Sequence, residues 1–139
     1  MKINRFEDLE CWQSARELVN RVYRVCSVSE LKKNFGLSDQ IKRAGISIMA
    51  NIAEGFSRKS NKEFIQFLFI SKASAAELQS HLYIALDQQY IDRSSFDDLY
   101  ADADKVQRQT SNLIKYLNST LGARPTRKLD ELDKHNERK

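Results

Sequence analysis

The sequence comprises 139 residues with a mass of 16.1 kDa, a length that suits one domain able to bury a core of its own. One proline and four glycines are too few for a turn-rich sheet protein, so we expect an all-α fold built from long helices. The formal net charge of +4 is mild, and the position of the charges therefore says more about partners than their total.

A first helix is predicted from Asp8 to Cys26. Apolar residues recur there at steps of three and four, which is the pattern of one buried helix face: Leu9, Trp12, Ala15, Leu18, Val22 and Val25. The same helix carries Cys11 and Cys26, 15 residues apart, so the two thiols lie too far apart on a rod to form a disulfide with each other. Unpaired cysteines, a start without the apolar core of a signal peptide, and no apolar run long enough for a membrane span lead us to expect a reduced, cytoplasmic protein.

The next segment, residues 28–37, is predicted to be a connection broken by Gly36. Three apolar residues in it are available to cover one end of a bundle: Leu31, Phe35 and Leu37. Helix two is predicted to begin at Ser38, a plausible N-cap, and to end at Gly55 or Phe56.

Helix two presents two different faces. One arc is apolar and suits the core: Ile41, Gly45, Ile48 and Ile52. The other arc is a polar row: Arg43, Ser47, Asn51 and Glu54. Two interpretations of the row stay open, an ordinary solvated outer face or a hydrogen-bonded network at an interface.

Helix three is predicted to follow a turn at Ser57–Ser60, with Ser60 and Glu63 forming a capping box, and to reach about Gln89. Helix four is predicted to start at Ser95 and to stop before Gly122. Four helices joined by short turns favour an antiparallel up-down four-helix bundle over residues 1–122. Residues 123–139 are highly charged and nearly without apolar side chains, which predicts a disordered tail.

Helix three is apolar over an unusually wide arc. One stripe suits the bundle core: Phe64, Leu68, Ser71, Ala75, Leu78 and Leu82. A second set lies about 100° to 140° further round the helix: Ile65, Phe69, Ala76 and Tyr83. We expect this second set to face another copy of the chain in a homo-oligomer, and the alternative is that the bundle wraps helix three deeply.

The basic charge is concentrated near the turn between helices two and three. Residues 29–62 carry seven Lys/Arg against three Asp/Glu, whereas residues 63–122 carry five against eight. An antiparallel bundle brings that turn together with both termini, and so gathers the following cations at one end: Lys2, Arg5, Arg58, Lys59, Lys62, Arg124, Arg127 and Lys128.

Such an end suits a phosphate backbone, and the free N–H groups at the start of helix three would add an anion site. The candidate nucleic-acid-binding residues are therefore Arg58, Lys59, Lys62, Arg124, Arg127 and Lys128, together with Lys42 of helix two. Apart from Phe56, aromatic residues for base stacking are missing among these cations, so binding without sequence specificity is expected.

The sequence contains no recognisable catalytic motif. A di-metal carboxylate site in a bundle needs Glu-x-x-His pairs, whereas His81 follows Glu77 by four residues and is the one histidine within the predicted helices. No Cys-x-x-Cys, glycine-rich phosphate loop or serine elbow occurs. We therefore expect a non-enzymatic protein without a metal or cofactor.

Two stretches carry a resemblance to a known family: FEDLECWQSARELVNRVY at 6–23 and GLSDQIKRAGISIMANIAEGFSRKSNKEFIQFL at 36–68. They resemble the four-helix bundle proteins encoded in bacterial 23S ribosomal RNA intervening sequences, which are similar to the accessory variability protein of diversity-generating retroelements. The positions that match the family are Gln40, Arg43, Asn51, Glu54, Gly55, Arg58, Ser60, Glu63 and Glu77. The chain departs from the family at Ala73-Ser74, where Gly-Ser is usual, and this puts a very close helix approach there in doubt.

The resemblance implies an antiparallel four-helix bundle that assembles as a barrel-like homopentamer. Members of the retroelement branch bind nucleic acid and a reverse transcriptase through basic surface. Two functions follow as expectations: an oligomer that binds RNA or DNA without sequence specificity, or an oligomeric protein scaffold, for example for a reverse transcriptase, with no nucleic-acid binding of its own.

Overall fold

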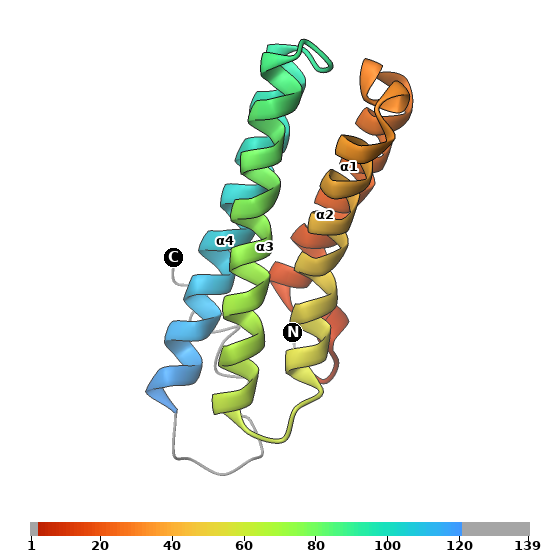
Figure 1. Cartoon of the computed structure of the whole chain (residues 1–139). Coiled ribbons are helices and arrows are strands. Elements are labelled where there is room, and N and C mark those ends of the chain that lie inside the picture. Colours follow the sequence, from red (N-terminus) through yellow and green to blue (C-terminus); the bar gives the residue numbers. More distant parts are fainter. Residues whose placement is uncertain (1–2, 121–139) are drawn as a thin grey trace.

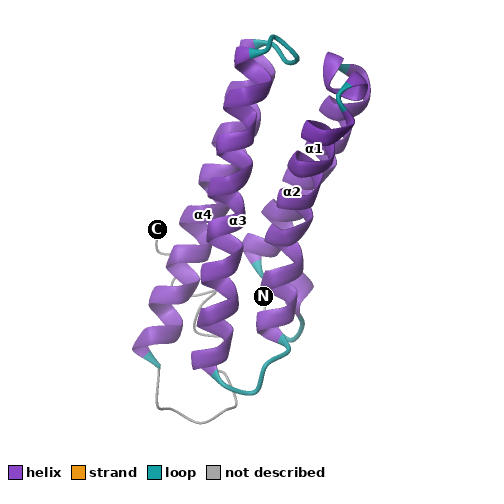
Figure 2. Cartoon of the chain, in the orientation of Figure 1, coloured by secondary structure: helices purple, strands orange, loops and turns teal. Residues whose placement is uncertain are grey.

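The computed structural model describes residues 3–120, which are helical apart from short connections (Figure 1, Figure 2). Four long helices follow one another: α1 (Glu10–Val28), α2 (Phe35–Phe56), α3 (Asn61–Asp87) and α4 (Arg93–Ser119). Two short 3-10 helices precede α1 and α2: η1 (Phe6–Asp8) and η2 (Glu30–Lys33). No strand occurs within residues 3–120, so the predicted all-α class is confirmed.

Hydrogen bonds between neighbouring helices give their relative direction. Asn61, at the start of α3, donates to the hydroxyl of Thr120, just after α4 (3.0 Å), whereas Gln79, further along α3, donates to Asp104, earlier in α4 (3.0 Å). Early residues of one helix thus meet late residues of the next, and the two helices run antiparallel. Each helix packs on the next, and α4 packs back on α1, which closes the four-helix bundle (Figure 1).

The core runs along the whole bundle and takes side chains from every long helix. The predicted stripe of α3 is buried without exception, with Phe64, Leu68, Leu78 and Leu82 fully inaccessible. The predicted face of α1 is also mostly buried, at Leu9, Ala15, Leu18 and Val22. Trp12 and Val25 lie half-buried at the edges of this face. The apolar periodicity therefore located the core correctly.

The helix α2 begins three residues earlier than predicted. Asn34 is its N-cap, because the side-chain oxygen of Asn34 accepts a hydrogen bond from the backbone N–H of Leu37 (3.0 Å). The predicted breaker Gly36 lies inside the first turn, and the predicted cap Ser38 is buried. Asn34 also donates to the hydroxyl of Tyr90 (3.3 Å), so the cap belongs to a contact between the two connections at one end of the bundle, which a local pattern does not reveal.

The predicted cover for the bundle end is only partly right. Leu31 is buried and Leu37 is half-buried, but Phe35 is 83% exposed. Phe35 is the first residue of α2 and lies on the solvent side of that turn. The prediction for Phe35 was therefore wrong, because it assumed an irregular connection where the structure has a helix start.

The starts of α3 and α4 differ in how well the sequence predicted them. Ser60 caps α3 as expected, with its hydroxyl accepting from the N–H of Glu63 (3.2 Å). The cap of α4 is Asp92 and not Ser95, because the Asp92 carboxylate accepts from the N–H of Ser95 (2.8 Å), which also lowers the pKa of Asp92. The predicted disordered tail at 123–139 lies outside the described residues.

Candidate nucleic-acid interface

The turn between α2 and α3 carries the cations that the sequence singled out. Lys59 and Lys62 are exposed, and neither forms an ion pair with another residue of the described part of the chain. Arg58 differs from them, because its guanidinium bonds to the Glu54 carboxylate (2.8 Å) and lies over the ring of Phe67 (4.7 Å from the centroid). Of the three turn cations, Lys59 and Lys62 are therefore the better placed for an external anion.

The expected anion site at the start of α3 is already occupied by side chains of the protein, Ser60 and Glu63. The hydroxyl of Ser60 caps the N–H of Glu63 and donates to the Glu63 carboxylate (3.2 Å). This carboxylate in the first turn is favourable next to the positive end of the helix dipole. A phosphate at this position would be repelled by the Glu63 carboxylate. The lysine side chains would therefore attract a phosphate more strongly than the start of the helix.

The other predicted cations are not all gathered at this end. Arg5 is paired with Glu7, an exposed contact that raises the pKa of the arginine and lowers that of the glutamate. Lys42 is half-buried with its ammonium 5.1 Å from the centre of the Tyr23 ring, and it lies about 21 Å along α2 from Phe56. Lys2, Arg124, Arg127 and Lys128 lie outside the described residues.

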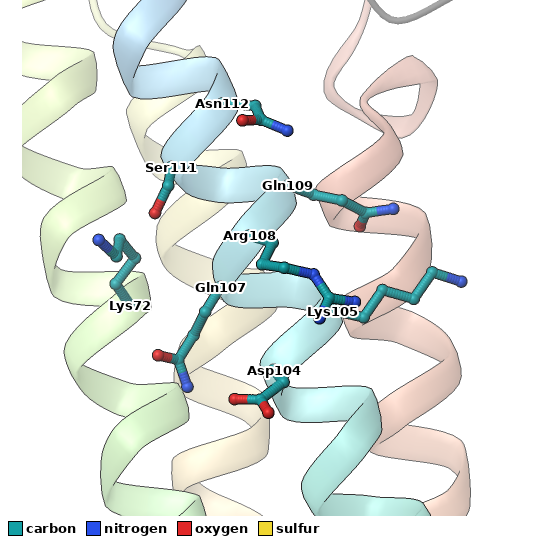
Figure 3. A pocket seen from close by; sticks show the side chains of 8 residues that line it. All are labelled: Lys72, Asp104, Lys105, Gln107, Arg108, Gln109, Ser111 and Asn112. Carbon is teal, nitrogen blue, oxygen red and sulfur yellow. The ribbon is translucent and has the colours of Figure 1, made fainter. Parts of the chain in front are cut away.

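The structure adds cations that the sequence reading missed, on α3 and on the second half of α4. Lys105, Arg108 and Lys115 are exposed on α4. Figure 3 shows Lys105 and Arg108 on α4 and Lys72 on the neighbouring helix α3. Lys72, Lys105 and Arg108 border an open hollow on the outer side of α4, which is also lined by Asp104 and by uncharged polar residues: Gln107, Gln109, Ser111 and Asn112. The contact of Asn61 with Thr120 places this half of α4 beside the start of α3 and hence beside Lys62.

Six cations together form what we call the basic surface: Lys59, Lys62, Lys72, Lys105, Arg108 and Lys115. The carboxylates nearest to it on α4 are engaged, since Asp104 accepts from Gln79 (3.0 Å) and Asp102 pairs with Arg21 (2.8 Å). The sequence signal was a change of sign along α4, since its N-cap and first half carry five aspartates over residues 92–104 and residues 105–120 carry none. Summing charge over residues 63–122 concealed this change.

The second apolar set of α3 lies mostly outside the core. Phe69 is 53% exposed, Tyr83 is 49% exposed, and Ala76 is also exposed, whereas Ile65 is buried within its own bundle. Tyr83 nevertheless packs against Phe96 of α4, with ring centroids 4.9 Å apart. We call the exposed apolar residues the outer face of α3: Phe69, Ile70, Ala76, Tyr83 and Ile84.

The polar row of α2 divides into three parts. Arg43 is exposed and bonds to Asp39 (2.8 Å), and Glu54 bonds to Arg58. Between them, Ser47 and Asn51 are half-buried where α2 meets α3, and the hydroxyl of Ser47 lies 2.8 Å from that of Ser74 at the family-variant Ala73-Ser74 site. The amide of Asn51 donates to the backbone oxygen of Ser47 (2.8 Å). The middle of the row thus joins α2 to α3 within one chain.

Other chemistry has little support among residues 3–120. No three His, Cys, Asp or Glu side chains of this part of the chain lie close enough together to hold a metal ion, and His81 lies 3.3 Å from the Glu77 carboxylate. Burial raises the pKa of the Cys11 thiol to about 12 and also raises the pKa of Cys26, so both remain protonated at neutral pH. None of the helices described here combines the length and the apolar character that crossing a membrane requires.

Comparisons with known proteins agree with this fold. The family described as 23S rRNA-intervening sequence protein matches residues 7–112. A crystal structure from Bacteroides thetaiotaomicron, of a protein with unknown function from the S23 ribosomal protein family, is similar with a TM-score of 0.69 and 28% identity, over 76% of this chain and 98% of that chain. Among curated proteins, none is similar enough to count as a match. Since the family match spans well over half of the sequence, the chain belongs to the 23S rRNA-intervening sequence protein family.

Proposed function

We propose that this protein is a non-enzymatic homo-oligomer that binds RNA or DNA through its basic surface, largely without sequence specificity. The observation that carries the proposal is the gathering of six cations at one end of the bundle and along the adjoining half of α4, with few unengaged carboxylates among them. Cations of this kind bind phosphates by releasing the counterions that surround a nucleic acid.

The absence of sequence specificity follows from the side chains that this surface offers. Lysines predominate, and a lysine ammonium contacts a phosphate as a point charge without reading a base edge. The ring of Phe69 lies beside one of these lysines, with the Lys72 ammonium 5.8 Å from its centre, and we assign Phe69 to self-association. Repetition of the basic surface in an oligomer, a pentamer by family resemblance, would raise the local positive potential further.

The decisive experiment measures affinity for short RNA and DNA, single- and double-stranded, as a function of salt. If all six cations contact phosphates, log affinity falls against log salt concentration with a slope of about −5 for duplex DNA and about −4 for single strands. The double variant Lys62→Glu/Lys115→Glu should bind at least roughly tenfold more weakly and with a slope shallower by about 2.

A matched control is Lys33→Glu, because Lys33 is exposed at the opposite end of the bundle, beside Glu30 (3.0 Å). This variant should keep the affinity and the salt slope of the natural chain. Equal losses in both variants, or binding that ignores salt, would contradict the assignment of the basic surface.

A second candidate function is a protein scaffold, and the outer face of α3 supports it. Phe69→Asp should reduce the mass measured by light scattering, because a charge would be buried if this face contacts another copy. The control Ile46→Asp alters a comparably exposed apolar residue on α2 and should leave the mass unchanged. An oligomer that retards neither RNA nor DNA in a gel would select the scaffold, whereas a natural chain that is monomeric would remove the role given to Phe69, Ala76 and Tyr83.

A further inference from the structure

The end of the bundle opposite the basic surface exposes apolar side chains that the proposed function does not use. Phe35 is 83% exposed and Val28 is 81% exposed, more than any other large apolar residue of the described chain. The two flank η2, so they belong to one connection between α1 and α2. Large apolar side chains gathered at one exposed site are a mark of an interaction surface.

This end of the molecule consists of two tips. The α1–α2 tip is residues 24–35 and the α3–α4 tip is residues 84–98, and Figure 1 shows both connections at the same end of the bundle. The hydrogen bond from Asn34 to the hydroxyl of Tyr90 (3.3 Å) joins the two tips. A partner that meets this end of the bundle would therefore contact both tips at once.

The two tips carry opposite charge. The α1–α2 tip has a net charge of +2 from three cations and one carboxylate: Arg24, Lys32, Lys33 and Glu30. The α3–α4 tip has a net charge of −3 from four carboxylates and one cation: Asp87, Asp92, Asp97, Asp98 and Arg93. The acidic tip also presents an exposed apolar residue, Ile84, beside the half-exposed Tyr83.

We propose that two copies of the chain associate end to end through this surface, with the α1–α2 tip of each copy against the α3–α4 tip of the other. A two-fold axis perpendicular to the bundle produces this pairing, because it places the basic tip of each copy opposite the acidic tip of the other. The other two-fold arrangement would set like charge against like charge at both tips. Phe35 and Val28 of one copy then cover the apolar side chains at the acidic tip of the other.

The contact is limited to the cross-section of one bundle end, so the association is weak and depends on concentration. It reaches the outer face of α3 only at Tyr83 and Ile84, whereas Phe69, Ile70 and Ala76 lie further along the side of the bundle. If the proposed side-by-side oligomer forms, end-to-end contact doubles its mass, and if it does not, the same contact turns monomers into dimers. The two proposals can therefore fail separately.

The test is sedimentation equilibrium of the full chain from micromolar to millimolar concentration. The natural chain should show a doubling of mass, and Phe35→Ser should weaken that step roughly tenfold or more, since an exposed anchor is lost without disturbing the core. The control Ile46→Ser changes an apolar residue away from this end and should leave the doubling intact, as should Phe69→Asp.

Charge reversal tests the pairing of the tips. Lys32→Glu/Lys33→Glu and Asp97→Lys/Asp98→Lys should each weaken the doubling, and combining all four changes in one chain should restore most of it. Absence of doubling up to millimolar concentration, or doubling that Phe35→Ser leaves unchanged, would overturn the proposal. Failure of the combined variant to recover would overturn the two-fold pairing.

Discussion

At the scale of single residues, the buried cysteine of α1 shows how packing sets chemistry. Cys11 lies in the core, and burial outweighs its hydrogen bond with Thr110, so the pKa of its thiol rises to about 12. The thiol is the neutral form that the interior favours, while the thiolate is the reactive one. Cys11 therefore serves as a packing residue, although the apolar stripe predicted from the sequence did not include it.

Cys11 should make stability depend on pH in the alkaline range. The folded pKa is about 12 and the unfolded value about 9, so the unfolded chain releases its proton first, and stability present below pH 9 is lost as pH rises toward 12. The loss approaches about 1.4 kcal/mol per pH unit from this one group. Urea unfolding of the natural chain and of Cys11→Ala between pH 8 and pH 11 measures it, and the expected result is a shallower decline in the variant. Parallel declines would contradict this role of the thiol.

Residue-scale hydrogen bonds also account for what the sequence could not give. Asn and Ser both cap helices, so the sequence alone does not distinguish Asn34 from Ser38 as the cap of α2. In the structure Asn34 is the cap, and it also contacts Tyr90, 56 positions away. Asp92 and Ser95 posed the same ambiguity at α4, where each residue type could have been the cap. Local patterns identified every long helix but not every start, since the cap of α2 also contacts the distant Tyr90, whereas α4 offered two local candidates three residues apart.

At the scale of elements, the contact between α2 and α3 depends on a glycine. A Cβ atom at Gly55 would lie 2.8 Å from the ring of Phe64 and 2.8 Å from the Cβ of Phe67. The two helices thus approach closely near their shared turn, before Ser71 donates to the backbone oxygen of Ile48 further along (2.8 Å). The Glu54-Gly55 pair in the sequence marks this approach, although its physical reason is visible only once α3 is in place.

Gly55→Ala should therefore destabilise the fold by about 1–3 kcal/mol, since the rings of α3 must shift to admit a methyl group. The control Gly36→Ala has its nearest neighbour at 3.8 Å in the exposed first turn of α2, and should be neutral or stabilising by up to about 1 kcal/mol. Chemical denaturation of the two variants measures the difference, and an equal response at both glycines would refute the close-packing explanation.

At the scale of the whole molecule, the four-helix architecture followed from sequence because apolar periodicity, caps and short turns all agreed. The distribution of charge over the surface could not be predicted from the sequence in the same way. Lys105, Arg108 and Lys115 lie in a segment whose summed charge is negative, and their proximity to Lys62 depends on the antiparallel contact of α3 with α4. The exposure of Phe35 was likewise not predictable, because an apolar residue in a connection can face the core or the solvent. Only the position of the helix start decides between the two.

The segregation of charge along α4 also bears on how fast the molecule finds a polyanion. Aspartates lie on the first half of α4 and cations alone among its charged residues lie on the second half, so the side-chain charges of this helix form a dipole along its length. If the chain binds nucleic acid as proposed, the field of the strand would favour encounters in which the basic second half of α4 leads. Such encounters would be oriented as well as accelerated, and the two tips at the other end of the bundle would stay clear of the bound strand.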